Sequence, residues 1–310
     1  MLTKIKVALW RFIYAPLYRI KYWRTRAERK KFRILNSEET IRYIISNKCS
    51  ICRMGDGEFQ MMSHYLNKHT ASNYNIDTFQ GYNEDLAKQL IEVYRSNSRN
   101  CLVCIPYAFK DSSVYKGYER IFFEREWLEC KDMLLYLEKG LPTRILGDSC
   151  CSRFYMSRKD IKDYPQYVQL LRTIWDGKEI ILIEGEKSRL GIGNDLFSNS
   201  KSIQRLLCPS TNAFDKYDEI LKYVKNNLAK SKLYLIALGH TATVLAYELS
   251  KLKFWAIDIG HVDIEYEWYR RKAKTKIAIP DKYVNEVKEG RIVSLLEDKQ
   301  YISEIINQIK

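Results

Sequence analysis

The sequence predicts an α/β protein with a Rossmann-like, mostly parallel sheet flanked by helices. Short apolar runs rich in β-branched residues alternate with helical patterns from residue 37 to residue 260. Hydrophobic residues make up 46% and charged residues 29% of the 310 residues, as in ordinary globular domains. No internal repeat or Pro/Gly-rich linker divides the chain. We therefore expect one domain over residues 35–310, preceded by a basic segment over residues 1–34.

The residues that flank the apolar and helical runs support the expected strands and helices. Asn36-Ser37-Glu38-Glu39 resembles a capping box, Asn83 is a helix N-cap residue, and prolines end two of the apolar runs. Residues 67–82 are polar and are expected to be irregular. The expected strands are 49–53, 101–105, 143–147, 179–183, 202–207, 233–238 and 255–259. The expected helices are 37–47, one ending near 65, 83–95, 125–138, 165–175, 215–229, 241–251 and one from 299.

The positive charge is concentrated in residues 1–34. The whole chain has a net charge of +14, while these residues hold 11 Lys or Arg against one acid, and the remaining 276 residues carry only +4. The folded body therefore lacks the basic stripe of a nucleic-acid-binding domain. Trp10, Trp23 and aliphatic side chains are interleaved with the basic residues, which predicts a basic amphipathic N-terminal helix that docks on an anionic membrane surface. The alternative is a solvated basic helix packed on the domain.

No segment is long enough to cross a membrane. The longest uncharged run of the basic segment, residues 12–18, has seven residues, whereas a spanning helix needs about 20. No cleavable signal pattern follows it. We expect a cytoplasmic protein, peripheral at the inner face of the plasma membrane.

Two cysteine pairs have a spacing typical of zinc ligands. Cys49 and Cys52, like Cys101 and Cys104, lie in apolar runs that are expected to be strands. Residues three apart on a strand point to opposite faces and do not grip one ion together. We expect buried, reduced cysteines instead.

The loop after the first predicted strand combines acidic, basic and glycine residues. In extended backbone Asp56 and Glu58 would project to the same side, where they would ligate one hard divalent cation. Gly55 permits close approach of a ligand to the backbone, and the planar fork of Arg53 suits a phosphate. The alternative is a Gly-Asp-Gly turn with solvated acids.

Three carboxylates follow the last predicted strand. Asp263, Glu265 and Glu267 alternate with apolar residues, so an extended stretch would place them on one face. Mutual repulsion would raise the pKa of one of them, which would then act as a general base. The alternative is an exposed amphipathic edge strand.

Two further loops suit a phosphorylated ligand. Gly239 and Thr241 precede a helix whose first backbone N–H groups would face a phosphate, and His240 is expected to be a cap or packing residue. Arg189 lies in a glycine-containing loop in which Asn194 and Asp195 would contact a sugar or a base. Together the four loops fit a metal-assisted transferase that uses a nucleotide sugar.

The motifs of these loops resemble those of the bacterial GT-D glycosyltransferases. They read RMGDGE, GEKSRLGIGNDLF, LGHTATVLAY and AIDIGHVDIEYEWY, and the resemblance covers about residues 37–280. It implies a Rossmann-like fold distinct from GT-A and GT-B, a UDP-sugar donor, and transfer of glucose to glycans of serine-rich adhesins. It implies a role for Asp56 and Glu58 with a divalent cation, Mn²⁺ or Mg²⁺, or with the diphosphate. It puts the catalytic glutamate at Glu265, with Glu267 as the alternative.

The expected function is therefore transfer of a hexose, glucose by resemblance, from a nucleotide sugar to a hydroxyl of a glycan acceptor. The basic segment suggests a lipid-linked acceptor, in the assembly of capsule or another surface polysaccharide or glycoprotein. His240 departs from the proline expected in the family. One alternative is a non-catalytic, membrane-docked protein that binds nucleotides or glycans. Another is a Rossmann-type oxidoreductase, which the missing Gly-x-Gly-x-x-Gly fingerprint disfavours.

Overall fold

A nine-stranded parallel sheet forms the centre of the computed structural model, which describes residues 14–67, 79–294 and 297–310. The strand order is β1-β4-β3-β2-β8-β7-β5-β6-β9, and every pair is parallel. The strands are β1 (Arg33–Ile34), β2 (Ser50–Arg53), β3 (Cys101–Ile105), β4 (Ile145–Asp148), β5 (Glu179–Gly185), β6 (Ser202–Cys208), β7 (Leu233–Ala237), β8 (Trp255–Asp258) and β9 (Ile305–Gln308).

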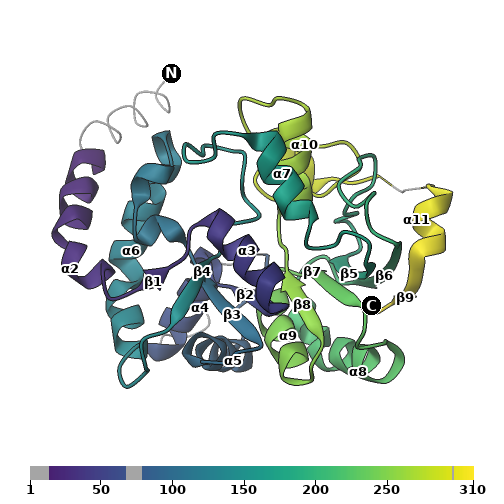
Figure 1. Ribbon diagram of the computed structural model, residues 1–310, viewed down its shortest axis with the longest axis horizontal. Coiled ribbons are helices and arrows are strands. Elements are labelled where there is room, and N and C mark those ends of the chain that lie inside the picture. Colours follow the sequence, from purple (N-terminus) through teal and green to yellow (C-terminus); the bar gives the residue numbers. More distant parts are fainter. Residues whose placement is uncertain (1–13, 68–78, 295–296) are drawn as a thin grey trace.

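Helices cover both faces of the sheet, as Figure 1 shows. One core lies between the sheet and α4, α5, α6, α8 and α9; the other lies between the sheet and α3, α7 and the start of α10. The helices are α2 (Arg26–Arg29), α3 (Ser37–Asn47), α4 (Asp56–Leu66), α5 (Glu84–Arg95), α6 (Gly117–Leu137), α7 (Tyr164–Arg172), α8 (Tyr217–Asn227), α9 (His240–Lys251), α10 (Val262–Arg270) and α11 (Lys299–Glu304). Strands buried on both faces read as continuous apolar runs, which explains their clear sequence signal.

The order in which strands are added to the sheet reverses between the parallel neighbours β2 and β8. It moves outward from β2 through β3 to β4, crosses to β5 and β6, and returns through β7 to β8 beside β2. The helix after β2, α4, packs into one core, while α10, after β8, packs into the other. Their connections thus diverge at the carboxyl ends of β2 and β8, which is where sheets of this kind have their ligand-binding crevice, and we call this region the crevice.

Most predicted elements are confirmed. All seven expected strands are present, and their ends differ from the expected ones by at most two residues. The N-cap roles of Asn36 and Asn83 are also confirmed, since their side chains accept from Glu39 N at 2.9 Å and from Leu86 N at 3.0 Å. The short strands β1 and β9 were not predicted, and α6 begins eight residues before the expected start at 125. Residues 68–78 of the expected irregular stretch lie outside the described residues.

The prediction of opposite faces for the paired cysteines is confirmed. Cys49 and Cys104 belong to the core on one face of the sheet, and Cys52 and Cys101 belong to the other. All eight cysteines are buried and free. Their burial, rather than a shared ligand, explains the spacing.

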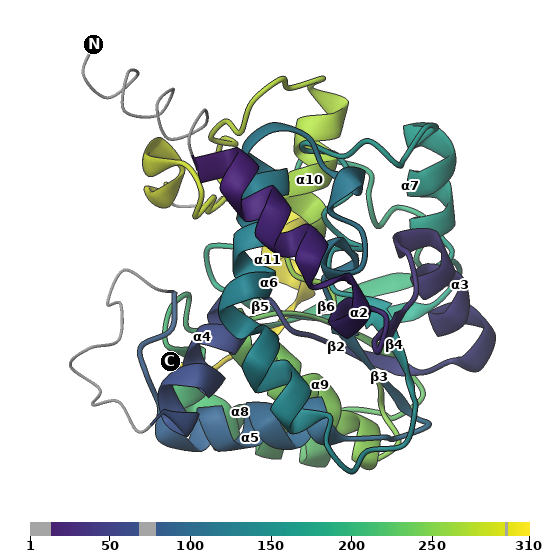
Figure 2. The same cartoon turned by 90° about the vertical axis from the view of Figure 1, so that its left-hand side faces the viewer.

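The described part of the basic segment packs against the domain. A helix over residues 14–24 and α2 lie across α6 (Figure 2), and β1 joins the sheet edge. Tyr22 and Phe32 are buried in the core, and Tyr22 Oη donates to Ala108 O at 2.8 Å. On the outer side Trp23 is 67% exposed. Residues 1–13 lie outside the described part, and none of the described helices is long and apolar enough to cross a membrane.

Candidate functional site

The crevice is built around an ion pair between Arg53 and Asp258, the last residues of β2 and β8. Arg53 Nη2 donates to Asp258 Oδ1 at 2.9 Å, and Nε donates to the Asp258 carbonyl at 2.9 Å. Nη1 donates to Ser149 O at 2.9 Å and Ser152 Oγ at 3.1 Å, so the whole fork is engaged inside the protein. A Cβ at Gly260 would lie 1.7 Å from Nη2, and the φ of +50° also requires glycine. Arg53 thus joins the two strands and the loop after β4.

Burial sets the electrostatics of this pair. It raises the pKa of Asp258, Arg53 opposes this effect, and the nearby Glu58 carboxylate adds to it. Burial lowers the pKa of Arg53, but Asp258 outweighs it and the pKa lies above its ordinary value. Thr243 Oγ1 in α9 is within 3.2 Å of Asp258 Oδ2 and donates to Arg53 O at 2.9 Å. Helix α9 is therefore fixed to the pair.

Asp56 and Glu58 lie in the first turn of α4, so the expectation of extended backbone is wrong. Glu58 Oε2 accepts from Gly55 N at 2.8 Å, which caps the helix. Residues two apart in a helix point in nearly opposite directions, because each residue turns the chain by about 100°. Asp56 is exposed and influences Glu126, whereas Glu58 influences Asp258. The two carboxylates therefore have different neighbours.

Because the two carboxylates point in different directions, they do not form a joint site, but either one alone fits a divalent cation that a bound ligand also helps to hold. No described residue donates to Asp56 or to Oε1 of Glu58. Negative charge accumulates around them, since Asp56 and burial raise the pKa of Glu126 to about 8, and Glu58 adds to the raised pKa of Asp258. Mg²⁺ is commonly bound by one or two carboxylates together with substrate phosphates. No cluster of three or more His, Cys, Asp or Glu side chains that could hold a metal ion occurs in the described residues.

The N-terminus of α9 lies beside that of α4. Gly239 precedes α9 with φ of +55°, and a Cβ there would lie 2.8 Å from the ring of Phe79. A Cβ at Gly57 would lie 2.3 Å from His240 Nε2, so the imidazole packs on the first turn of α4. Thr241 Oγ1 is buried with no partner among the described residues. The structure thus brings Gly55, Asp56, Glu58, Gly239 and Thr241 to one side of the crevice.

Glu265 lies on the other side of the crevice and is buried in α10. Its Oε2 accepts from Tyr155 N at 2.8 Å and from Met156 N at 3.0 Å. No described residue donates to Oε1. Burial raises the pKa of Glu265, although Arg153 and the two N–H groups lower it. A positioned carboxylate with one uncommitted oxygen and a raised pKa has the properties of a general base.

Arg153, His261 and Glu286 surround Glu265. Arg153 Nη1 donates to Glu286 Oε1 at 2.9 Å, Arg153 Nη2 lies 3.0 Å from His261 Nδ1, and His261 Nε2 lies 3.3 Å from Glu286 Oε1. Burial raises the pKa of Glu286, but His261 and Arg153 outweigh it and hold that pKa far below its usual value. Because the guanidinium only donates, Nδ1 accepts and Nε2–H faces Glu286. Both imidazole nitrogens are therefore occupied.

The alternation of Asp263, Glu265 and Glu267 does not form a strand; the stretch is helix α10, and the expectation of an extended stretch is wrong. Asp263 and Glu267 lie one turn apart and share Asn194, whose Nδ2 donates to Asp263 Oδ1 at 2.8 Å and Glu267 Oε1 at 2.7 Å. Lys282 Nζ donates to Asp263 Oδ2 at 2.5 Å. Glu265 projects to the other side of the helix. All three are buried, so neither the single acidic face nor an exposed edge strand exists.

Arg189, Asn194 and Asp195 are engaged in contacts within the protein. Arg189 Nη1 donates to Asp281 O at 2.8 Å, Asn194 joins the loop to α10, and Asp195 accepts from Tyr266 Oη at 2.8 Å. These contacts position the loop after β5 over α10. Sequence reasoning missed Asp258, Arg153, His261, Lys282 and Glu286 as partners of the predicted residues. Only Asp258 and His261 had a sequence signal, since both lie in the motif that begins in β8 and continues into α10.

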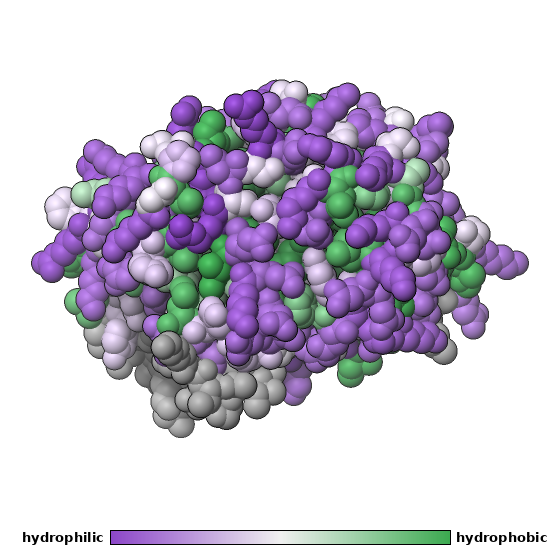
Figure 3. All heavy atoms as spheres, turned by 90° about the horizontal axis from the view of Figure 1, so that it is seen from below, coloured by the Kyte–Doolittle hydropathy of each residue, from purple (hydrophilic) through white to green (hydrophobic). Residues whose placement is uncertain are grey.

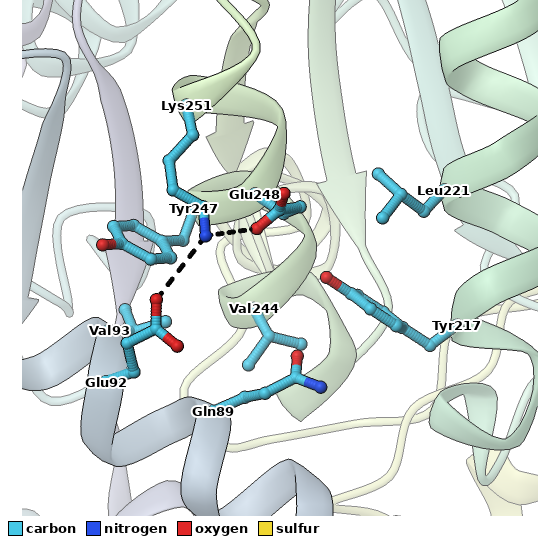
Figure 4. Close-up of a pocket in the computed structure, with 9 residues that line it drawn as sticks. All are labelled: Gln89, Glu92, Val93, Tyr217, Leu221, Val244, Tyr247, Glu248 and Lys251. Carbon is cyan, nitrogen blue, oxygen red and sulfur yellow. Dashed lines mark hydrogen bonds and ion pairs between the residues drawn. The ribbon is translucent and has the colours of Figure 1, made fainter.

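A groove among α5, α8 and α9 is separate from this crevice. Its lining includes Gln89, Tyr217, Val244 and Tyr247, and Lys251 contacts both Glu92 and Glu248 at its edge (Figure 4). It lies on the helical face seen in Figure 3, where charged side chains surround small apolar patches. The converging polar groups lie instead at the carboxyl ends of β2 and β8.

The fold defines a parallel α/β protein whose candidate ligand site lies at the point where the strand order reverses. The family model described as "Glycosyltransferase GT-D fold" matches residues 51–287. The chain belongs to this GT-D fold family of glycosyltransferases.

Named relatives and solved structures agree with this family. "Glycosyltransferase GlyD" of Streptococcus pneumoniae serotype 4 (strain ATCC BAA-334 / TIGR4) is 32% identical over 88% of this chain and 32% of the relative. "Probable glycosyl transferase Gly" of Streptococcus gordonii is 30% identical over 90% of this chain and 39% of the relative. The chain thus spans about a third of the length of these relatives.

The structures cover nearly the whole chain. One is described as "The highly conserved domain of unknown function 1792 has a distinct glycosyltransferase fold"; it has a TM-score of 0.83 and 34% identity over 93% of this chain and 100% of that one. Another, "A New Glycosyltransferase (DUF1792) from Streptococcus sanguinis", has a TM-score of 0.77 and 28% identity over 90% of this chain and 100% of that one. The expected family and fold are confirmed.

Proposed function

We propose that this chain transfers a hexose, glucose in the first instance, from a UDP-sugar to a hydroxyl of a glycan acceptor. The observation that carries the proposal is the arrangement of the crevice. Two helix N-termini, of α4 and α9, lie on one side, and Glu265 with an uncommitted oxygen lies on the other. The N-terminus of α9 suits the diphosphate of the donor, the acidic first turn of α4 suits a cation that the diphosphate chelates, and the Glu265 carboxylate suits deprotonation of the acceptor.

Glu265 is the proposed general base. Its backbone partners Tyr155 and Met156 hold Oε2, which leaves Oε1 to accept the proton of the acceptor hydroxyl. Glu267 and Asp263 are less suited to this role, because Asn194 and Lys282 already occupy their oxygens. We assign these two carboxylates, with Asn194, to positioning α10.

Arg53 and the loop of Arg189, Asn194 and Asp195 are proposed to shape the donor site indirectly. Arg53 fixes the crevice walls through Asp258, and the loop contacts fix the wall beside α10. Direct donor contacts are assigned to Gly239 and Thr241, because the backbone N–H of Gly55 already donates to Glu58. Either Asp56 or Glu58, together with the donor, would hold Mn²⁺ or Mg²⁺, and that cation would neutralise the charge of the leaving diphosphate. Calorimetry should then show tighter UDP binding with the cation than with a chelator.

We further propose that the enzyme works at the cytoplasmic face of a membrane, on a lipid-linked glycan of capsule or another surface polymer. The exposed outer side of the helix over residues 14–24, with Leu17, Ile20 and Trp23 among basic residues, supports this proposal. Use of the donor, use of the acceptor and binding to the membrane are each tested in a separate experiment.

The function is tested with a panel of UDP-, GDP- and dTDP-sugars, scored by released nucleotide with and without a glycan acceptor. Release from one donor is expected, and Glu265→Gln should lower kcat about 10²- to 10⁴-fold while leaving UDP affinity unchanged. Because the base must be ionised, activity should rise with pH through a pKa above that of an ordinary glutamate. Glu267→Gln is the matched control and should chiefly lower stability. Unchanged turnover in folded Glu265→Gln would exclude the assignment, and absence of nucleotide binding would favour a glycan-binding protein.

A further inference from the structure

The first turn of α9 carries polar atoms that nothing in the described protein satisfies. His240 is 7% exposed and Thr241 is fully buried, yet His240 Nδ1, His240 Nε2 and Thr241 Oγ1 have no hydrogen-bond partner among the described residues. A buried polar atom left without a partner costs about 1–3 kcal/mol. Three such atoms within two residues therefore indicate a place that a polar ligand fills.

Packing of the His240 ring on α4 leaves both of its nitrogens without a hydrogen-bond partner among the described residues. A buried histidine in a packing role normally has at least one ring nitrogen bonded to the protein or to water. Here the ring lies against Gly57, where an added Cβ would be 2.3 Å from Nε2 and 2.8 Å from Cε1. Only glycine at this position lets the imidazole reach the first turn of α4. The ring thus lies where the N-termini of α4 and α9 meet.

The two helix ends have complementary ligand preferences. Helix α9 has 12 residues and an N-cap, Gly239, that supplies no side-chain hydrogen bond, so its first N–H groups and its dipole favour an anion. The first turn of α4 instead holds Asp56 and Glu58, which repel an anion and attract a cation. A ligand that matches both ends is a phosphate chelated to a cation. A nucleoside diphosphate presents this chemistry in its terminal phosphate.

We propose that His240 donates a hydrogen bond from its imidazole to the terminal phosphate of the donor's nucleoside diphosphate, beside Thr241 Oγ1. This inference deepens the proposed function and rests on it. It makes His240 a binding residue for the leaving group. It also explains why Gly57 separates the two acidic residues of α4.

The experiment is calorimetry with UDP and with UMP, in the presence of Mg²⁺, on the full chain. A hydrogen bond to a charged group contributes about 1.5–3 kcal/mol, so His240→Leu should weaken UDP binding about 10- to 150-fold. UMP lacks the second phosphate, and its affinity should change by less than about twofold. His240→Gln keeps a donor and should bind UDP with intermediate affinity. Ser250→Ala, near the other end of α9, is the matched control and should bind UDP like the wild type.

The outcomes separate this inference from the proposed function. If the wild type binds UDP and His240→Leu binds it with the same affinity, the role of His240 is overturned and the proposed transferase function stands. An equal loss of UDP and UMP affinity assigns His240 to the general shape of the site and also overturns it. No binding of any nucleoside diphosphate by the wild type overturns both. Should the variants not fold, the wild-type His240 imidazole resonance must shift with UDP and stay in place with UMP.

Discussion

Glu126 illustrates how one buried side chain links the site to stability. It is 3% exposed in α6, and burial together with Asp56 raises its pKa to about 8. Above the ordinary glutamate pKa the unfolded chain has released this proton while the native protein still holds it. The native state then binds more protons than the unfolded state, so the free energy of unfolding falls as pH rises towards 8.

The prediction is that the wild type loses about 2–3 kcal/mol of stability between pH 5.5 and pH 8 through this group. Glu126→Gln has no proton to release and should remove most of that loss. Urea unfolding at the two pH values measures it. Asp132→Asn, whose side chain is 82% exposed in the same helix, is the matched control and should keep the wild-type dependence. An equal pH dependence in Glu126→Gln and the wild type would contradict the assignment.

At the scale of single elements, the helix over residues 14–24 has an outer side that the domain does not cover. Leu17 and Ile20 are each 49% exposed and Trp23 is 67% exposed. At 3.6 residues a turn these three side chains span an arc of about 120°, with Lys21 beyond one edge and Arg19 beyond the other, while Arg24 lies inside the arc. An apolar strip bordered by basic residues fits the surface of an anionic bilayer.

Co-sedimentation tests this helix. The wild type should bind vesicles containing phosphatidylglycerol more tightly than vesicles of phosphatidylcholine, and salt should weaken the binding. The triple change of Leu17, Ile20 and Trp23 to Ser should reduce it at least about tenfold, because it removes the apolar contact. Ile302→Ser, an exposed position on α11, serves as control. Equal binding by the triple variant and the wild type would exclude this surface as the docking site.

The elements also differ in how well the sequence predicts them. The run Glu179–Ile183 predicts β5 because a strand buried on both faces is continuously apolar. In α10 the charges recur every second residue, which imitates a strand, because loops surround this helix and bury Asp263 and Glu267 on one side and Glu265 on the other. The rule that alternating charged and apolar residues predict a strand assumes that one face of the segment is exposed to solvent, which is not so for α10. The strands β1 and β9 are short and pair with residues about 100 positions away, so no local pattern indicates them.

At the scale of the molecule, the seam between β2 and β8 joins the two halves of the sheet. Only Ile51 and Ile257 are in register there, whereas β2 and β3 share four pairs. The Arg53–Asp258 pair adds its hydrogen bonds at the carboxyl end of the seam. The same contact therefore holds the halves together and shapes the crevice.

Removing either partner should leave the other as a buried uncompensated charge, at a cost of about 3–5 kcal/mol. Arg53→Met and Asp258→Asn are each expected to lower the free energy of unfolding by about this amount. The double variant should lose less than the sum, since the interaction is lost only once. Urea unfolding of the four proteins measures the coupling. Strictly additive losses in the free energy of unfolding would show that the interaction between Arg53 and Asp258 does not stabilise the junction of β2 and β8.

The late closure of this seam has a consequence during synthesis. Residues 51 and 257, which face each other across it, are separated by 206 positions, so at about 5–20 residues per second the ribosome needs about 10–40 s between them. Strands β2, β3 and β4 are complete well before β8 emerges. A nascent chain therefore presents these three strands while its binding crevice does not yet exist. Chains released early would carry the acidic turn of α4 but no opposite wall, and so no competence to bind or hydrolyse a donor.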